Sequence, residues 1–345
     1  MPAWAPLLET YSGAGSGFLR FDFFGMGTQN VFLVAGASEA ILRRAVQEGM
    51  QLLDRLEQRL SKFLPDSDVT LVNELGAHSP VHVSSDLFNV LEKAHQACHY
   101  TDGAFDPTVG PLLDAWGFVN QDWRVPADSE IERLLELRGM HHVKLNSAAQ
   151  TVHLRRPGVT IDLGAIGKGY AADRLAESLR GHGVTTGAVI CGRSTVVTWG
   201  TPPGEDNWSF DVVHPLRPQS SLLTLAVEPG ALSSSGAYEK CFHHGAHEYG
   251  HVFDPRTGRP TCSPMKGVTV WTRSAMLGDV LSTALFVRGR EALSSSEKLA
   301  QLATRWEGDD ARTGFLLVEA APNNAEGVAW STHFFGAPPF VETRL

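Results

Sequence analysis

An acid, three glycines and a lysine stand close together near the middle of the chain. The segment 161–170 reads IDLGAIGKGY and leads into apolar spacing typical of an amphipathic helix. A strand–turn–helix unit of this kind exposes backbone N–H groups where phosphate or another anion binds. Lys168 adds a positive charge, and Asp162 and the turn carbonyls are oxygen ligands that suit Mg²⁺. The segment therefore predicts a site for a metal-bound phosphate compound.

This segment matches neither of the two common nucleotide-binding motifs. It contains no G-x-x-x-x-G-K-[ST] and no G-x-G-x-x-G. Spacing alone therefore leaves a second reading open, in which the segment is a tight strand–helix turn and Lys168 is solvated.

A second segment, Ala104–Pro111, combines one aromatic ring with one carboxylate in a glycine-containing loop. The Phe105 ring could stack on a planar ligand while Asp106 accepts a hydrogen bond from a ring N–H or a ribose. The alternative is an ordinary turn in which Asp106 bonds its own backbone before Pro107.

A histidine precedes an acid and a tight turn in the segment 251–258, which reads HVFDPRTG. Asp254 could orient the imidazole of His251, which could then accept a proton from a hydroxyl nucleophile. The alternative is a β-turn in which Asp254 caps its own backbone. A zinc site at this end of the chain is disfavoured, because glycines interrupt the helix that would bring the histidines together: His243, His244, His247 and His251.

An acid and a hydroxyl stand four residues apart in the expected helix 278–287. Asp279 and Thr283 therefore share one helix face, where they can bind one hard cation. In the alternative reading, Asp279 is an acid near the start of its own helix and Thr283 is packed.

The composition is that of a globular protein and excludes several classes. The chain has 345 residues, of which 43% are hydrophobic and 19% charged, so one large domain or two are possible. A net charge of −9 argues against a general nucleic-acid binder. We expect no membrane-spanning segment, no signal peptide and no N-terminal lipid-anchor cysteine, since the first cysteine is Cys98. Scattered cysteines favour a reduced, cytoplasmic protein.

Helices and strands are expected in mixed order without a regular strand–helix repeat, which favours an α+β fold. We expect a loose lead-in over 1–17 and a single domain over 18–345. The expected helices cover 39–63, 66–72, 87–100, 129–138, the segment after Lys168, and 278–287, and a loop covers 101–116. Strand-like runs over 18–34 lie around residues 25–28, and further strands are expected over 143–152, 187–197, 208–213, 222–227, 267–271 and 313–318.

The order of these motifs is more specific than any one of them. They run Met26-Gly27-Thr28, Ser61-Lys62-Phe63, Ser67-Asp68, Asn73, Gly103–Thr108, Trp116-Gly117-Phe118, Asp162–Tyr170, Ser234–Tyr238, His251–Gly258, Asp279 and Ser282-Thr283. This succession resembles the ApbE family of FAD:protein FMN transferases over roughly residues 20–320.

The resemblance implies a fold, a reaction and a set of site residues. The fold would be α+β with a T-fold-like mixed sheet packed with helices. The reaction would use FAD and Mg²⁺ (Mn²⁺ is possible) to move FMN onto a Thr or Ser hydroxyl of a target protein and release AMP. Some relatives hydrolyse FAD to FMN and AMP instead, so an FAD pyrophosphatase is the second reading. The implied metal ligands are Asp279, Thr283 and the Ala165 carbonyl; the implied FAD contacts are Met26, Ala104, Phe105, Asp106, Asp162, Lys168 and Phe253. His251 would be the base, with Asp254 supporting it and Lys168 stabilising charge.

The chain departs from the family in the strand after the central helix. Arg193 follows Gly192 where the family has a second glycine, and Cys191 precedes them. Arg193 could add a phosphate contact or obstruct the pocket, so a non-catalytic flavin-binding protein remains a third reading. Ser234 and Phe253 are smaller departures. We expect a cytoplasmic protein, or an exported one if a leader has been removed.

Overall fold

A large antiparallel sheet organises the protein. The computed structural model describes residues 8–9, 17–236, 241–245, 247–261, 264–294, 296–321, 327–335 and 337–343. Within them, eight strands pair in the order β18-β17-β16-β11-β8-β7-β3-β2, and each neighbouring pair is antiparallel. These strands are β2 (Leu19–Gly25), β3 (Thr28–Ala35), β7 (Thr186–Cys191), β8 (Thr195–Trp199), β11 (Ala231–Gly236), β16 (Met265–Thr272), β17 (Thr313–Ala320) and β18 (Val328–Phe335).

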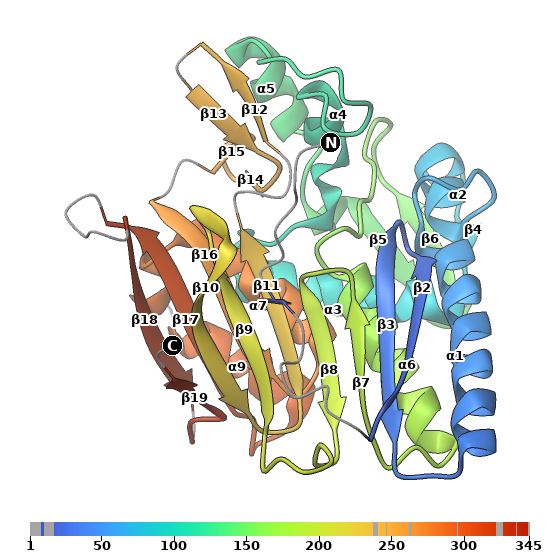
Figure 1. The fold of residues 1–345 in the computed structure, drawn as a ribbon. Helices are drawn as coiled ribbons and strands as arrows, with labels where there is room; N and C mark the ends of the chain where they lie inside the picture. The colour runs from blue at the N-terminus through green and yellow to red at the C-terminus, as the bar shows by residue number, and fades with distance from the viewer. Residues whose placement is uncertain are drawn as a thin grey trace.

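Helices cover one face of this sheet (Figure 1). The large core lies between them and the sheet, and it includes Phe32 of β3, Leu53 of α1 and Leu281 of α7. The apolar spacing expected over 39–63 does form a helix, which ends at Leu60. The helices are α1 (Glu39–Leu60), α2 (Asp68–Leu75), α3 (Ser85–Tyr100), α6 (Gly167–Gly181), α7 (Ala275–Arg288), α8 (Glu291–Ser294) and α9 (Ser296–Glu307).

A smaller sheet covers the opposite face, so the fold has three layers (Figure 1). Its strand order is β1-β9-β10-β19, and Trp208 and Leu225 pack against Leu33 of the large sheet. The strands are β1 (Leu8–Glu9), β9 (Trp208–His214), β10 (Arg217–Val227) and β19 (Phe340–Thr343). A three-stranded sheet also forms from β4 (Val81–His82), β5 (Val143–Asn146) and β6 (Thr151–Leu154). The α+β class is therefore confirmed.

A third group of elements forms an aromatic cluster beyond one end of the large sheet (Figure 1). Trp116, Phe118, Phe242 and Phe253 form its centre. Its elements are η1 (Pro107–Val109), α4 (Gly110–Ala115), α5 (Asp128–Leu135), β12 (Cys241–His244), β13 (His247–Gly250), β14 (Phe253–Asp254) and β15 (Arg259–Pro260).

Three expectations about local structure were wrong. The loop expected over 101–116 contains η1 and α4. The single strands expected over 143–152 and 187–197 are hairpins, because turns interrupt them. In the second hairpin, Gly192 has φ +63°, a left-handed conformation that glycine adopts readily and that turns β7 into β8. Among the described residues, no helix is long and apolar enough to cross a membrane.

Candidate functional site

The turn before α6 is held by contacts from two distant segments. The Asn73 side chain accepts from Ile161 N at 2.7 Å and donates to Ile161 O at 3.0 Å. The next amide, Asp162 N, donates to Pro107 O at 2.8 Å. These contacts fix the backbone that enters the turn and join it to the 104–111 segment, so two segments expected to bind one ligand are neighbours.

The Asp162 carboxylate pairs with Lys62, to which the sequence motifs assign no role. Lys62 Nζ lies 2.6 Å from Asp162 Oδ2, and the two side chains are only 18% and 14% exposed. The other oxygen accepts from Gly164 N at 2.7 Å. Asp114 is close to this pair: burial raises the pKa of Asp114, Lys62 lowers it and Asp162 raises it. The orientation of Asp162 is therefore set before any ligand binds.

Lys168 lies in the first turn of α6 and reaches toward the large sheet. Its Nζ donates to Ser194 Oγ at 2.6 Å, and Ser194 is buried in the β7–β8 turn. Arg193 precedes Ser194 and is exposed. The cation of Lys168 thus stands in the first turn of a helix, which suits an anion, and Arg193 lies in the turn that Lys168 contacts. Burial raises the pKa of the Cys191 thiol to about 12, so this neighbour is not a reactive thiolate.

Met26 joins this group from the β2–β3 turn. It has a left-handed backbone, with φ +52°. Its Cε lies 4.0 Å from the position that a Cβ on Gly167 would occupy, so the side chain lies against the start of α6. Gly192 N donates to Gln29 O at 2.9 Å, which joins the β7–β8 turn to the same region. Met26, Lys168 and the β7–β8 turn are therefore neighbours.

Asp279 lies in the second turn of α7, because the helix begins at Ala275 and not at residue 278. It is 7% exposed, and its carboxylate accepts from Gly169 N at 2.7 Å and from Thr195 Oγ1 at 2.9 Å. Burial raises the pKa of Asp279, and the nearby charge of Lys168 opposes that rise. The alternative reading, an acid near the start of its own helix, is therefore wrong: Asp279 caps α6 instead.

Two further oxygen atoms are expected at the metal, the Thr283 hydroxyl and the Ala165 carbonyl. Thr283 Oγ1 lies one helical turn beyond Asp279, with Ser235 Oγ at 3.4 Å. Within the described residues, no backbone N–H donates to the Ala165 carbonyl, since Gly169 N donates to Asp279. Carboxylate, hydroxyl and carbonyl oxygens are the ligands that Mg²⁺ and Mn²⁺ prefer. The donor set therefore fits the expected metal.

The Phe105 ring does not fit the expected stacking role in this arrangement. It is 1% exposed and belongs to the large core, as does the neighbouring Ala104. Phe105 N donates to Thr101 Oγ1 at 3.1 Å, which folds the loop inward. The backbone of Ala104 and Phe105 could still contact a ligand, but a stacked ring would have to leave the core.

One carboxylate oxygen of Asp106 caps the short helix η1, and the other has no hydrogen-bond partner among the described residues. Its Oδ1 accepts from Thr108 N at 2.9 Å and from Thr108 Oγ1 at 2.6 Å, which is the turn considered as the alternative. Its Oδ2 is buried without a hydrogen-bond partner among the described residues. Burial raises the pKa of Asp106. A buried acceptor without a donor is costly, so a ligand N–H or O–H would stabilise it.

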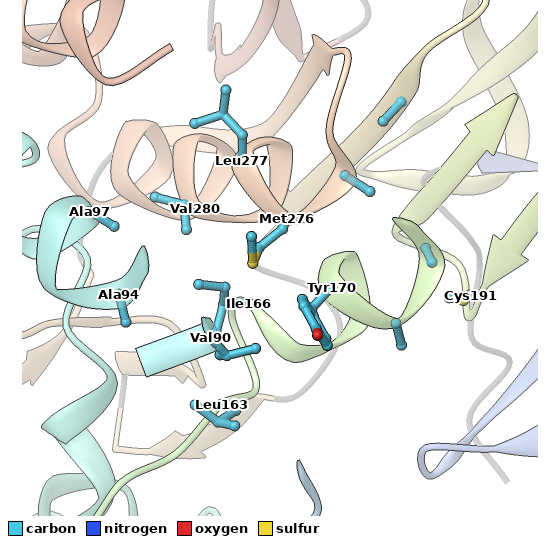
Figure 2. Packing of buried hydrophobic residues seen from close by; sticks show 14 of the residues in the cluster. Val90, Ala94, Ala97, Leu163, Ile166, Tyr170, Cys191, Met276, Leu277 and Val280 are labelled. Atoms are coloured by element: carbon cyan, nitrogen blue, oxygen red, sulfur yellow. The ribbon is translucent and has the colours of Figure 1, made fainter. Parts of the chain in front are cut away.

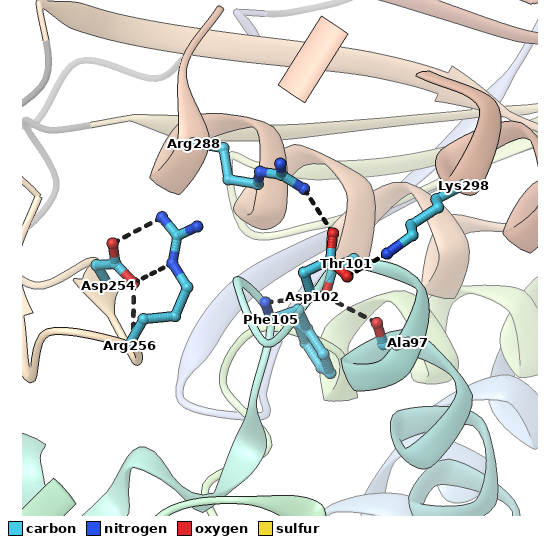
Figure 3. A network of polar contacts seen from close by, with 8 residues as sticks. All are labelled: Ala97, Thr101, Asp102, Phe105, Asp254, Arg256, Arg288 and Lys298. Atoms are coloured by element: carbon cyan, nitrogen blue, oxygen red, sulfur yellow. Dashed lines mark hydrogen bonds and ion pairs between the residues drawn. The ribbon is translucent and has the colours of Figure 1, made fainter. Parts of the chain in front are cut away.

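The Asp254 carboxylate pairs with Arg256 (Figure 3). Its Oδ1 and Oδ2 accept from the Arg256 guanidinium, each at 2.8 Å, and Oδ1 also accepts from Arg256 N. This is the β-turn reading, in which Asp254 folds its own loop. Phe253 is also not free to contact a ligand, because it is 5% exposed and packs on Trp116.

The segment that carries His251 still lies beside the metal-ligand helix. His251 is half-buried just before β14, and β14 packs against α7. Asp102, two residues before Ala104, accepts from Arg288 at the end of α7 at 3.3 Å and from Lys298 of α9 (Figure 3). These contacts hold the loop at 101–106 beside the C-terminal end of α7. The turn at 251–256 is close to the same end, since the charge of Asp102 contributes to the raised pKa of Arg256.

The other three histidines of that segment lie on one hairpin. His243, His244 and His247 lie exposed on the β12–β13 hairpin. No group of three or more histidine, cysteine or acidic side chains that could hold a metal occurs in the part of the chain that the structure describes. The zinc reading disfavoured by the sequence gains no support.

Comparison with known proteins identifies the relatives of this chain. The sequence model of the ApbE family matches residues 26–305. The protein named FAD:protein FMN transferase from Klebsiella pneumoniae (strain 342) is 30% identical over 267 residues, covering 77% of this chain and 81% of its own length. The one from Vibrio cholerae serotype O1 is 31% identical over 245 residues, with 70% and 72% covered.

The fold is also similar to that of a solved ApbE protein. The structure of the ApbE protein from Thermotoga maritima superimposes with a TM-score of 0.77 at 28% identity, covering 91% of this chain and 96% of that one. The span that the family model matches contains the Asp162–Lys168 turn, His251, Asp279 and Thr283. On the family match, the identities and the shared fold, the chain belongs to the ApbE family.

Proposed function

We propose that this protein transfers FMN from FAD to a Thr or Ser hydroxyl of a target protein in a Mg²⁺-dependent reaction that releases AMP. The observation that carries the proposal is the meeting of Lys168, Asp279 and the Ala165 turn at the N-terminus of α6. This supplies cationic, anionic and carbonyl groups where a metal-bound diphosphate needs them. The names of the curated relatives support FAD as the substrate.

The proposed step exchanges one phosphoester partner for another. The acceptor hydroxyl oxygen attacks the phosphorus of the FMN half, and the bond from that phosphorus to the bridging oxygen breaks. AMP leaves with that oxygen and its electron pair, and the hydroxyl proton passes to His251 Nδ1 or Nε2. Lys168 stabilises the negative charge that develops on the phosphates, whereas the amides of Gly167 and Gly169 already donate to Leu163 O and to Asp279.

The metal would be held by Asp279, Thr283 and the Ala165 carbonyl. When bound, Mg²⁺ neutralises phosphate charge and orients the diphosphate. Around it, Asp162 is fixed by Lys62, and Asp106 Oδ2 offers an acceptor to a donor group of FAD. Met26 supplies an apolar contact beside α6.

One incubation tests the proposal. The purified protein is mixed with FAD and Mg²⁺, with and without a protein that carries threonine-linked FMN in its mature state, prepared free of flavin. AMP is measured by chromatography and the acceptor by mass spectrometry. AMP release only with acceptor, together with an acceptor mass gain equal to one FMN, is the expected result. AMP release without acceptor would make the protein an FAD hydrolase, and no AMP in either sample would leave a flavin-binding protein.

A further inference from the structure

Two helices of the site begin side by side and cap each other. Asp279 in α7 accepts from Gly169 N in the first turn of α6 at 2.7 Å. In return, Asp173 in α6 accepts from Ala275 N at 2.8 Å and Met276 N at 3.0 Å in the first turn of α7. Each aspartate stands four residues after a capped position of its own helix, 169 to 173 and 275 to 279. The two caps are therefore reciprocal.

The helix ends are in direct contact. A Cβ on Gly169 would lie 2.4 Å from Ala275 O and 2.7 Å from Met276 Cα, so only glycine allows this approach. Figure 2 shows the Met276 side chain pointing toward Ile166 and Tyr170 at the start of α6. Two helix N-termini carry partial positive charges that repel each other at short range. A carboxylate on each end offsets that repulsion and satisfies N–H groups that helices leave without partners.

Asp173 makes one more contact that fixes α7. Its Oδ2 accepts from Ser274 Oγ at 2.7 Å, and Ser274 is the N-cap residue of α7. Three bonds thus join one side chain of α6 to three consecutive residues of α7. The hydrogen bonds of Asp173 go to residues 274–276, so the proposed chemistry does not use its carboxylate directly.

We propose that Asp173 is a positioning residue for the metal ligands and acts through α7. By holding residues 274–276, it fixes where Asp279 and Thr283 lie relative to the Ala165 carbonyl, which is two residues before α6. A slide of α7 along α6 by the rise of one residue, about 1.5 Å, would break the bond from Gly169 N to Asp279 and separate the metal ligands together. The metal part of this inference rests on the proposed function.

The first test follows hydrogen exchange in Asp173→Asn. Asparagine keeps the size of the side chain but presents an NH₂ group to one of the donors that the carboxylate accepts from. If the two caps are one device, the amide of Gly169 should exchange at least about tenfold faster, although Asp173 does not bond that amide. Faster exchange confined to Ala275 and Met276 would contradict the proposal, because it would show an isolated cap.

The second test measures binding of Mn²⁺ by electron paramagnetic resonance, in the presence of FAD. We expect Asp173→Asn to bind Mn²⁺ at least about fivefold more weakly, with its KM for FAD at saturating metal changed by less than about twofold. Equal Mn²⁺ affinity in Asp173→Asn and in the unaltered protein would refute the positioning role of Asp173 without contradicting the proposed function. If the unaltered protein binds no Mn²⁺, the positioning proposal and the metal in the proposed function are both wrong. FMN transfer itself is tested by the incubation with FAD and acceptor, so its failure is recognised separately.

Two variants separate positioning from stability. Ser84→Ala removes the N-cap of α3, where Ser84 Oγ accepts from Leu87 N, and should lower the melting temperature without changing Gly169 exchange or Mn²⁺ affinity. A change in either readout with Ser84→Ala would show that general destabilisation is the cause. Should Asp173→Asn fail to fold, Ser274→Ala removes one of the three donors and should shift both readouts in the same direction by a smaller factor.

Discussion

Removing the lysine that holds Asp162 should weaken FAD binding. In Lys62→Met, the Asp162 carboxylate loses a partner at 2.6 Å while remaining 14% exposed and close to Asp114. A charge-assisted hydrogen bond contributes about 1.5–3 kcal/mol, and a carboxylate left without its cation would also repel the diphosphate. A loss of about 1.4 kcal/mol is a factor of ten in an equilibrium constant. We therefore expect the dissociation constant for FAD to rise about tenfold or more.

Fluorescence titration of FAD measures this effect, with thermal unfolding recorded alongside. Lys62→Arg keeps the charge and should recover most of the affinity. Lys93→Met is the matched control, because Lys93 lies over the Trp306 ring, with Nζ 4.8 Å from its centroid. Among the described residues, the ion pair of Asp162 is with Lys62 and not with Lys93. It should leave FAD affinity unchanged. Equal or tighter FAD binding by Lys62→Met would show that the ion pair is not part of the binding site.

Three further outcomes are expected. His251→Ala should lower transfer by about a hundred- to ten-thousand-fold while leaving the FAD dissociation constant within about twofold, and steady-state kinetics with titration would expose unchanged turnover. Arg193→Gly should weaken FAD binding about tenfold, because the exposed guanidinium beside Ser194 favours a phosphate contact over an obstruction; tighter binding would support obstruction. Burial raises the pKa of Glu307, which accepts from Arg273 N and Ser274 N, to about 7. Because this folded-state pKa exceeds the unfolded one, the folded protein binds the extra proton between about pH 4.5 and 7, and stability falls as pH rises through that window. Glu307→Gln should flatten the fall, and melting temperatures at pH 5 and 8 that keep the original difference would refute the assignment.

The sequence predicts those features that depend on neighbouring residues. The helices expected over 66–72 and 87–100 form as α2 and α3, and each begins within two residues of the expected start. Ser67 and Ser84 cap them, because their hydroxyls accept from amides three residues on. The order of the motifs also predicts the family and the meeting of Lys168 with Asp279. These features are local, or are carried by residues whose types and order are characteristic.

Contacts that form only on tertiary packing could not be predicted from neighbouring residues in the sequence. Lys62 pairs with Asp162 across one hundred residues of sequence, and Asp173 meets α7 over a similar separation. No local spacing links such partners. The ring of Phe105 suits a planar ligand, and the family resemblance implies an FAD contact for Phe253. Both side chains are instead buried in cores, where rings of that size also pack well. Asp254 was expected to orient His251, but Arg256, two residues away, is the partner it takes.

The metal requirement at Asp279 tests the central claim most directly. AMP release from FAD is measured for the unaltered protein and for Asp279→Ala across a Mg²⁺ titration, with EDTA as the metal-free sample and acceptor present. Loss of activity in EDTA, recovery with Mg²⁺ or Mn²⁺, and loss of that recovery in Asp279→Ala are the expected results; Thr283→Val, which removes a neutral ligand, should be affected less. Full FAD turnover in EDTA, or an Asp279→Ala protein with an unchanged Mg²⁺ dependence, would contradict the account.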